Sequence, residues 1–203
     1  MTTSTSPDRR QPLQARAAAR RARFLEVATQ LIGTKGYEAV SMKAIAQVAG
    51  ASVGTLYDYF PDKPAVALAL LADYADELDA YWARVFAEPP APCAEAFADQ
   101  LMDAVLGFVQ ARPAYLPLIS SPVAYSRSTA QRQPLRHTIA GALQHANTRL
   151  SAERAHLAAN VIVELFKALL AVLERSAPEE NQRAIDEFRL LMKLYLDQLM
   201  LQA

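Results

Sequence analysis

The segment 41–63, SMKAIAQVAGASVGTLYDYFPDK, constrains the fold more than any other part of the chain. It predicts a short helix over 42–48, which Ser41 caps by accepting a hydrogen bond from a free backbone N–H. Gly50 ends that helix, because glycine enters the left-handed conformation without a steric penalty. A second short helix follows over 52–59. Two short helices joined by a glycine turn predict a helix-turn-helix.

The residue types along these two helices support that geometry. Ala46 is small enough for two helices to cross closely, and Ile45, Val53 and Leu56 are apolar and spaced to fill the angle between them. The outward positions of the second helix carry short or rigid hydrogen-bonding side chains, namely Ser52, Thr55, Tyr57 and Tyr59. Such groups suit phosphate oxygens and base edges, so the segment predicts a DNA-binding surface.

The segment also resembles the DNA-binding part of a known protein family. Gly50, the run Thr55-Leu56-Tyr57-Asp58-Tyr59-Phe60 and then Lys63 are similar to the DNA-binding domain of TetR-family transcriptional regulators. The resemblance implies a homodimeric repressor that binds a palindromic operator on double-stranded DNA and is released by a small-molecule effector. The competing interpretation is a pair of packed surface helices in an ordinary helical protein.

The resemblance also implies which residues contact DNA: Ser41, Lys43, Ser52, Val53, Gly54, Thr55, Tyr57, Tyr59 and Lys63. Lys43 matches the position that contacts a base edge, and Ser41 holds a phosphate at a helix N-terminus. Alternatives stay open for two of them. Tyr57 can instead pack its ring in the core, and Lys63 can be an ordinary solvated charge.

Two residues depart from the family pattern. Met42 stands where a hydroxyl is common, and Asp58 stands where an aromatic or basic side chain is common. A carboxylate at that position repels DNA unless a cation pairs with it. We therefore predict that Asp58→Asn tightens DNA binding without changing the preferred sequence.

Charge is divided unevenly along a chain whose formal net charge is zero. Residues 1–63 hold nine Lys/Arg and five Asp/Glu, and residues 64–203 hold 12 and 16, giving +4 and −4. Residues 1–13 are expected to be disordered, and a helix over 14–35 carries several arginines. Arg20 and Arg23 are predicted DNA contacts, the alternative being a solvated basic face.

The rest of the sequence predicts an all-α protein. Helices are expected over about 64–86, 94–112, 128–150, 151–175 and 178–201, with an irregular proline-containing stretch between 113 and 127. The domains expected are therefore a tail (1–13), a helix-turn-helix domain (14–63) and a larger helical sensing and dimerisation domain (64–203). The lone Cys93 excludes an internal disulfide, and the N-terminal residues lack the apolar core of a signal peptide, which favours a cytoplasmic protein.

Two sets of residues in the larger domain are predicted to line a ligand pocket and to form a dimer interface, with ordinary core packing as the alternative for both. The set expected to line a ligand pocket is Trp82, Phe97, Leu101, Met102, Val105, Phe108, Tyr115, Tyr125, Glu164 and Phe166. The set expected at a dimer interface is Leu165, Leu169, Val172, Phe188, Leu191, Met192, Tyr195 and Leu199. Glu164 is expected to pair with Lys167 or a partner's arginine, or else to balance a cationic ligand.

No metal or other cofactor is predicted. The three histidines, His137, His145 and His156, lack the spacing of a helical metal pair, and no phosphate-binding glycine loop or nucleophile motif is present. An enzyme is therefore disfavoured. The alternative function is a sequence-tolerant architectural DNA-binding protein, since Val53 and Gly54 offer few base-specific donors.

Overall fold

The computed structural model describes residues 10–87, 91, 93–123 and 129–201. Within these residues every regular element is a helix, which confirms the all-α prediction. The helices are α1 Arg10–Lys35, α2 Met42–Val48, α3 Val53–Tyr57, α4 Lys63–Val85, α5 Ala94–Gln110, α6 Tyr115–Ile119, α7 Thr129–Ala146, α8 Ala152–Arg175 and α9 Pro178–Leu201.

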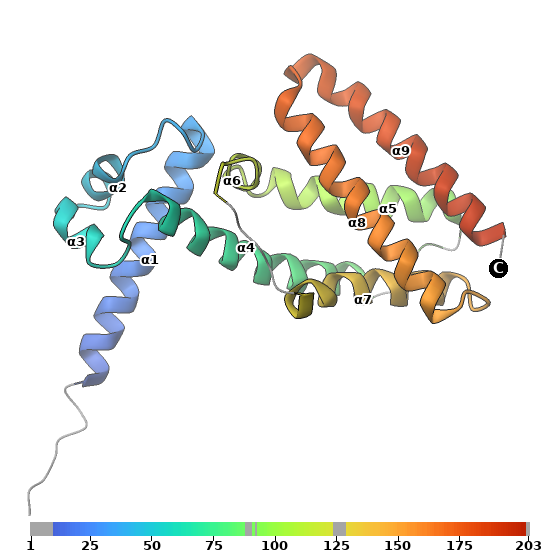
Figure 1. Ribbon diagram of the computed structural model, residues 1–203, viewed down its shortest axis with the longest axis horizontal. Helices are drawn as coiled ribbons and strands as arrows, with labels where there is room; N and C mark the ends of the chain where they lie inside the picture. Colours follow the sequence, from blue (N-terminus) through green and yellow to red (C-terminus); the bar gives the residue numbers. More distant parts are fainter. Residues whose placement is uncertain (1–9, 88–90, 92, 124–128, 202–203) are drawn as a thin grey trace, which may run out of the picture.

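The head consists of α1, α2, α3 and the N-terminal part of α4, and it lies at one end of the molecule (Figure 1). Side chains cap the N-termini of three of its helices, α2, α3 and α4. Ser41, Ser52 and Asp62 accept hydrogen bonds from the backbone N–H groups of Ala44, Thr55 and Ala65 at 3.2, 3.0 and 2.7 Å. These bonds satisfy N–H groups that have no partner inside the helix, which fixes where each helix begins.

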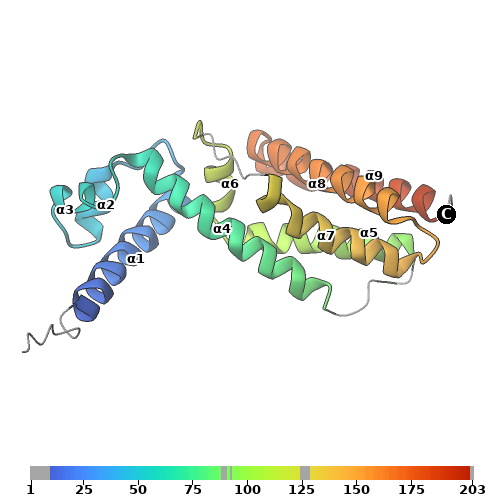
Figure 2. The same cartoon turned by 60° about the horizontal axis from the view of Figure 1, so that its bottom comes forward.

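The body consists of the C-terminal part of α4 together with α5, α7, α8 and α9, which pack side by side (Figures 1 and 2). Its core is centred on aromatic and aliphatic side chains that are buried to about 1% exposure or less, including Trp82, Phe97, Leu101 and Ile162. Trp82 stacks on Phe166 with ring centroids 5.4 Å apart. Polar cross-links brace the outside, since Arg189 of α9 donates to Asp99 and Asp103 of α5 at 2.6 and 2.8 Å.

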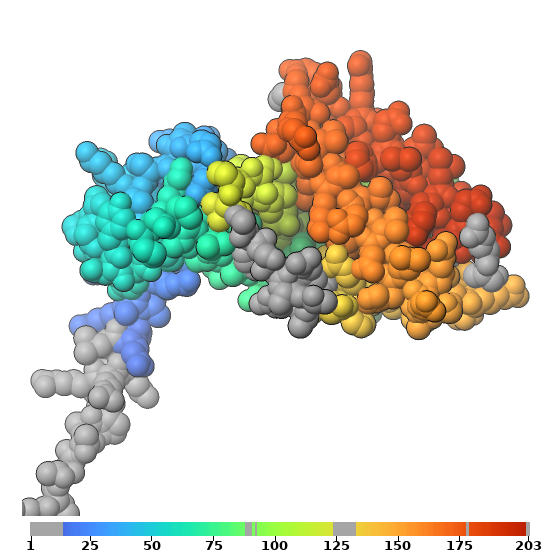
Figure 3. Space-filling view, in the orientation of Figure 1, coloured from blue at the N-terminus to red at the C-terminus, as the bar shows by residue number. Residues whose placement is uncertain are grey.

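The short helix α6 joins head and body. Ala114 and Leu118 are fully buried in the head's core, whereas Tyr115 lies against the ring of Phe108 in the body. A Cβ placed on Gly33 of α1 would lie 3.1 Å from the Pro113 Cβ, so glycine permits this close approach. The surface view shows the head as a separate lobe beside the body, with α6 in the crease between them (Figure 3).

Two expectations about local structure are corrected. Residues 10–13 belong to α1 rather than to a disordered tail, and residues 1–9 lie outside the described part of the chain. The stretch expected to be irregular contains α6, with Pro117 inside it. Proline is tolerated there because the first four N–H groups of a helix have no intrahelical acceptor.

Among the described residues, α8 alone is long and apolar enough to cross a membrane by length and composition. Eight of its residues, however, are buried against the rest of the protein, including Ile162, Phe166 and Leu169. A core helix of a globular protein has the same composition, so α8 is explained by its packing.

Candidate nucleic-acid interface and ligand cavity

The turn between α2 and α3 has the geometry that the sequence predicts. Gly50 adopts a φ of +69°, and its neighbour Ala51 donates to the Ala46 carbonyl at 2.9 Å. Ile45, Ala46 and Leu56 have no measurable exposure. The two helices are thus locked together by a small, dry contact, and α3 has one face free for a ligand.

The hydroxyls at the start of α3 are linked to each other. The Oγ of Ser52 caps α3 and lies 2.8 Å from the Oγ1 of Thr55. Ser52 is exposed and Thr55 is half-buried, so the pair sits at the surface in a fixed orientation. Gly54 beside them is open, because a Cβ there would meet only the Ser52 Oγ, at 3.8 Å.

The remaining predicted contacts on this surface differ in exposure. Tyr57 is 51% exposed, so its ring is not part of the core, whereas Tyr59 packs edge-to-face on Phe24 with centroids 5.6 Å apart. Lys43 is exposed on α2. Asp58 is also exposed, and none of the ion pairs among the described residues involves it. Its negative charge is therefore unbalanced locally.

Lys63 is engaged inside the head. Its Nζ donates to the carbonyls of Tyr37 and Glu38 at 3.2 and 3.4 Å and lies 4.2 Å from the centroid of the Tyr37 ring. Burial, followed by the carboxylates of Glu38 and Asp62, raises the pKa of Tyr37. In this arrangement Lys63 ties the α1–α2 loop to the start of α4, a role that its position in the motif does not reveal.

The two arginines predicted on α1 are both exposed. Arg23 pairs with Glu26 one turn along the helix at 2.8 Å, and both side chains remain about half exposed. Such a surface pair is weak and opens easily for another anion. The neighbouring Arg21, which the sequence did not single out, lies over the Phe60 ring at 5.5 Å from its centroid.

A cavity of about 690 Å³ lies between α4 and α8, is bounded by α5, α6 and α7 as well, and opens to solvent on one side. Its walls are mostly apolar. From α4 and α8 they comprise Leu71, Ala75, Leu78, Trp82, Val163, Phe166, Leu170 and Ala171, and from α5 and α6 they comprise Val105, Phe108, Val109, Tyr115 and Ile119. This size and composition are typical of a small-molecule site.

Half of the predicted pocket residues line this cavity, namely Trp82, Val105, Phe108, Tyr115 and Phe166. Phe97, Leu101 and Met102 do not line it. They lie nearer the N-terminal end of α5, in the body's core, and are exposed by 1% or less. Tyr125 lies outside the described residues. Sequence analysis missed all the charged lining residues, Arg136, Lys167, Glu174 and Arg175, and also apolar ones such as Leu71 and Leu170.

Glu164 is corrected from a pocket residue to a surface residue. Its side chain is 60% exposed, and its Oε1 accepts from Lys167 at 2.8 Å and from Arg136 at 3.4 Å. The expected pairing with Lys167 is confirmed. With two cations already bound, this carboxylate is not a counter-charge waiting for a cationic ligand.

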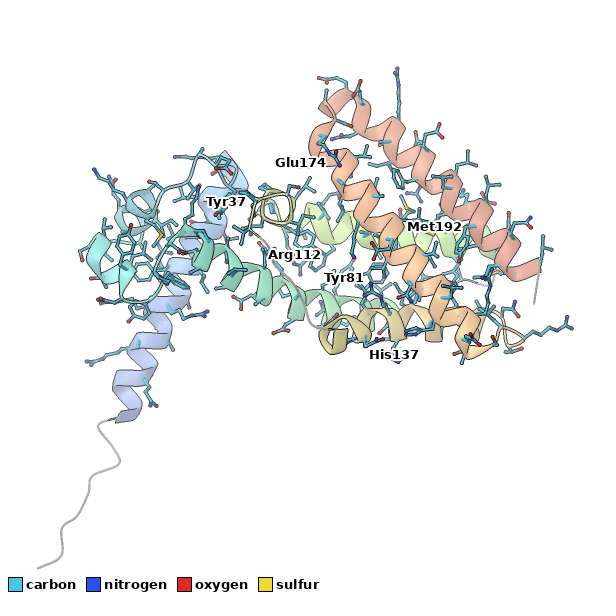
Figure 4. The ribbon with its side chains drawn as sticks, in the orientation of Figure 1. Tyr37, Tyr81, Arg112, His137, Glu174 and Met192 are labelled. Carbon is cyan, nitrogen blue, oxygen red and sulfur yellow. The ribbon has the colours of Figure 1, made fainter. Side chains whose placement is uncertain are left out.

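The predicted interface residues divide into two groups. Leu169, Met192 and Leu199 are buried in the subunit's own core at 0, 1 and 3% exposure, and Figure 4 shows Met192 on α9. They are therefore not available to a partner. Leu191 is 49% exposed, and Leu165, Val172, Phe188 and Tyr195 are half-buried. The apolar residues most exposed on α8 and α9 are Leu157, Val161, Leu190, Leu191, Leu194 and Leu201.

Comparison with known proteins matches both halves of the chain to families. Residues 24–70 match the family described as "Bacterial regulatory proteins, tetR family", and residues 95–196 match "Tetracyclin repressor-like, C-terminal domain". The HTH-type transcriptional repressor KstR of Rhodococcus jostii is 43% identical over 60 residues, which cover 30% of this chain and 28% of that protein. KstR of Mycolicibacterium smegmatis is 41% identical over 61 residues. The chain thus matches less than a third of the length of these relatives.

Solved structures share the fold over nearly the whole chain. A TetR-family transcriptional regulator from Pectobacterium atrosepticum superposes with a TM-score of 0.74 at 17% identity, covering 92% of this chain and 96% of that one. A possible TetR-family regulator from Streptomyces coelicolor A3(2) gives a TM-score of 0.66 at 15% identity, covering 90% and 100%. At these identities the likeness concerns the fold alone.

A helix-turn-helix head joined to an all-helical body with a cavity defines the class of helix-turn-helix transcriptional regulators. The C-terminal family match alone spans 102 of the 203 residues, just over half. Together with the N-terminal match it shows that the chain belongs to the TetR family of bacterial regulatory proteins. Members of this family regulate transcription and are not enzymes.

Proposed function

We propose that the protein is a cytoplasmic, homodimeric repressor that binds a palindromic operator and is released from it by a small-molecule effector. The observation that carries this proposal is the shared position of α6. Leu118 of α6 is buried in the core of the head, while Tyr115 and Ile119 of the same helix line the cavity in the body. A change in the cavity therefore has a direct mechanical route to the head.

The proposed dimer uses the exposed apolar face of α8 and α9. Leu190, Leu191 and Leu194 are each about half exposed on α9, and Leu157 and Val161 lie one turn apart on α8. Burying these side chains against the same face of a second copy would form a four-helix bundle. Exposed leucines in this number and spacing on paired helices favour a partner over solvent.

The proposed operator contacts lie on α2 and α3 and at their N-termini. We infer that Lys43 and Thr55 contact base edges and that Ser41 and Tyr57 contact phosphates; Ser41, Lys43 and Tyr57 are exposed and Thr55 is half-buried. Gly54 has open space in front of it and permits close approach of the DNA. In a twofold dimer the two α3 helices would enter the major groove about one DNA turn apart.

Capture of fragmented genomic DNA by the purified full-length protein at near-physiological salt, followed by sequencing, tests this proposal. We expect one or a few short palindromes to be enriched by roughly a thousandfold over bulk DNA. Recovery of DNA without sequence preference, steeply lost as salt rises, would instead identify an architectural DNA-binding protein. Analytical ultracentrifugation of the same sample provides the oligomeric state.

A further inference from the structure

The cavity differs in charge from its floor to its rim. The floor is apolar and runs along α4 from Leu71 to Trp82. These two residues are eleven positions apart, which corresponds to about 16 Å at the helical rise of about 1.5 Å per residue. The facing wall is the stripe of α8 from Val163 to Arg175, of similar length. The cavity lining therefore extends over about three turns of each helix.

The rim of the cavity is cationic. Arg136, Lys167 and Arg175 all line it, and among the lining residues Glu174 is the one carboxylate. Figure 4 shows Glu174 at the end of α8 nearest α6. Lys167 is 58% exposed, so its ammonium lies at the mouth, whereas the side chain of Arg136 is only 13% exposed and lies deeper.

The Glu164 carboxylate does not cancel this charge. It lies outside the lining and accepts from both Arg136 and Lys167, while Arg175 adds a third cation to the lining. Arg136 also donates from its Nε to the Oδ1 of Asn160 at 2.5 Å, which holds its guanidinium in place. A fixed guanidinium beside an exposed ammonium suits a carboxylate or another compact anion.

We propose that the effector of this cavity is an amphipathic organic anion with an extended apolar body, whose charged end lies at the rim beside Arg136 and Lys167. This inference rests on the proposed function and specifies the chemical class of the effector. The apolar body lies between α4 and α8 against Trp82 and Phe166.

Trp82 is the only tryptophan in the chain and lines the cavity, so its fluorescence reports occupancy directly. Four probes test the proposal, each at concentrations where it is dissolved as a monomer: dodecanoate, dodecanol, dodecyltrimethylammonium and benzoate. We expect dodecanoate to bind about tenfold more tightly than dodecanol. Dodecyltrimethylammonium should bind the most weakly of the three chain probes, and benzoate more weakly than dodecanoate.

The double variant Lys167→Gln/Arg175→Gln tests the rim, because both residues are exposed and dispensable for the core. It should clearly reduce the preference for dodecanoate over dodecanol, because only Arg136 then remains beside the charged end, and it should bind dodecanol as before; an unchanged preference would overturn the rim assignment. Arg149→Gln, which removes an exposed positive charge outside the cavity lining, is the matched control and should keep the preference.

Equal binding of the anionic and cationic chain probes would overturn the charge assignment, and equal binding of benzoate and dodecanoate would overturn the extended shape. Absence of any response of Trp82 to all four probes would overturn the whole inference. Operator capture separates these results from the function itself. A protein that enriches a palindrome but binds no probe keeps its proposed function and loses its proposed effector class.

Discussion

Replacing Lys63 by methionine separates a structural role from a DNA-contacting role. The sequence motif predicts that this lysine contacts a phosphate, whereas in the structure its ammonium is bonded inside the head to the Tyr37 and Glu38 carbonyls. Methionine keeps the apolar stem and removes the charge and its hydrogen bonds. The two roles therefore make different predictions for one variant.

The expected loss of stability follows from the contacts. The bonds at 3.2 and 3.4 Å are at or beyond the usual upper limit of about 3.2 Å, so together they contribute about 1 kcal/mol. The ammonium lies 4.2 Å from the Tyr37 centroid, which adds about 0.5 kcal/mol. The ion pair with Glu38 at 3.9 Å adds little, because that carboxylate is 78% exposed. We expect Lys63→Met to lower the free energy of unfolding by about 1.5 kcal/mol.

Urea unfolding measures the change in the free energy of unfolding, and the salt dependence of operator affinity measures the number of phosphate contacts. Loss of one phosphate contact per subunit would flatten the slope of log K against log salt by about 0.9 per contact, or about 1.8 for a dimer. A structural role predicts an unchanged slope. Lys43→Met is the control, since this exposed lysine should affect operator binding and leave stability unchanged. An unaltered unfolding curve with a slope reduced by about 2 would refute the structural assignment.

Four further substitutions test other features of the structure. Gly54→Ala should stabilise α3 by about 0.5 kcal/mol, since the new Cβ meets nothing closer than 3.8 Å. It should nevertheless lower operator affinity about tenfold, because the Cβ occupies the space that the DNA needs. Equal affinity in a gel-shift titration would show that the DNA does not approach Gly54 closely. Asp58→Asn should tighten operator binding without altering the preferred sequence, and unchanged or weaker binding would contradict the repulsion argument. Leu194→Glu should dissociate the dimer in sedimentation experiments, whereas an intact dimer would place the interface elsewhere. The hydrogen bond from Arg189 lowers the pKa of Asp99, so this ion pair stabilises the fold above the ordinary Asp pKa and stops doing so as pH falls through the lowered pKa. Asp99→Asn should therefore remove up to about 1 kcal/mol of the pH dependence of the free energy of unfolding, measured by urea unfolding at several pH values. An unchanged pH profile would assign that dependence to other carboxylates.

Short-range chemistry explains why the head could be predicted from sequence. A glycine at φ +69°, two serine caps and an aspartate cap each act within four residues, so their effect is visible in the sequence itself. The role of Lys63 was not visible, because its acceptors lie 25 and 26 residues earlier in the chain.

The rotation of the last two helices could not be predicted for a different reason. Leu191 and Met192 are adjacent and both apolar, yet one is 49% exposed and the other 1%. Where apolar residues surround a helix, periodicity does not say which side faces its own subunit and which side faces a partner. Periodicity also fails to separate Phe97 from Phe108, which lie on one face of α5 three turns apart, yet only Phe108 lines the cavity.

The burial of α6 in the head limits how such regulators can be recombined. A chimera that joins this head to a foreign body at the end of α4 would leave out Ala114 and Leu118 and open a hole beside Gly33. Its head would lose buried apolar contacts before any operator was tested. A functional graft must therefore carry the segment 111–120 as well, together with a matching surface for it on the new body.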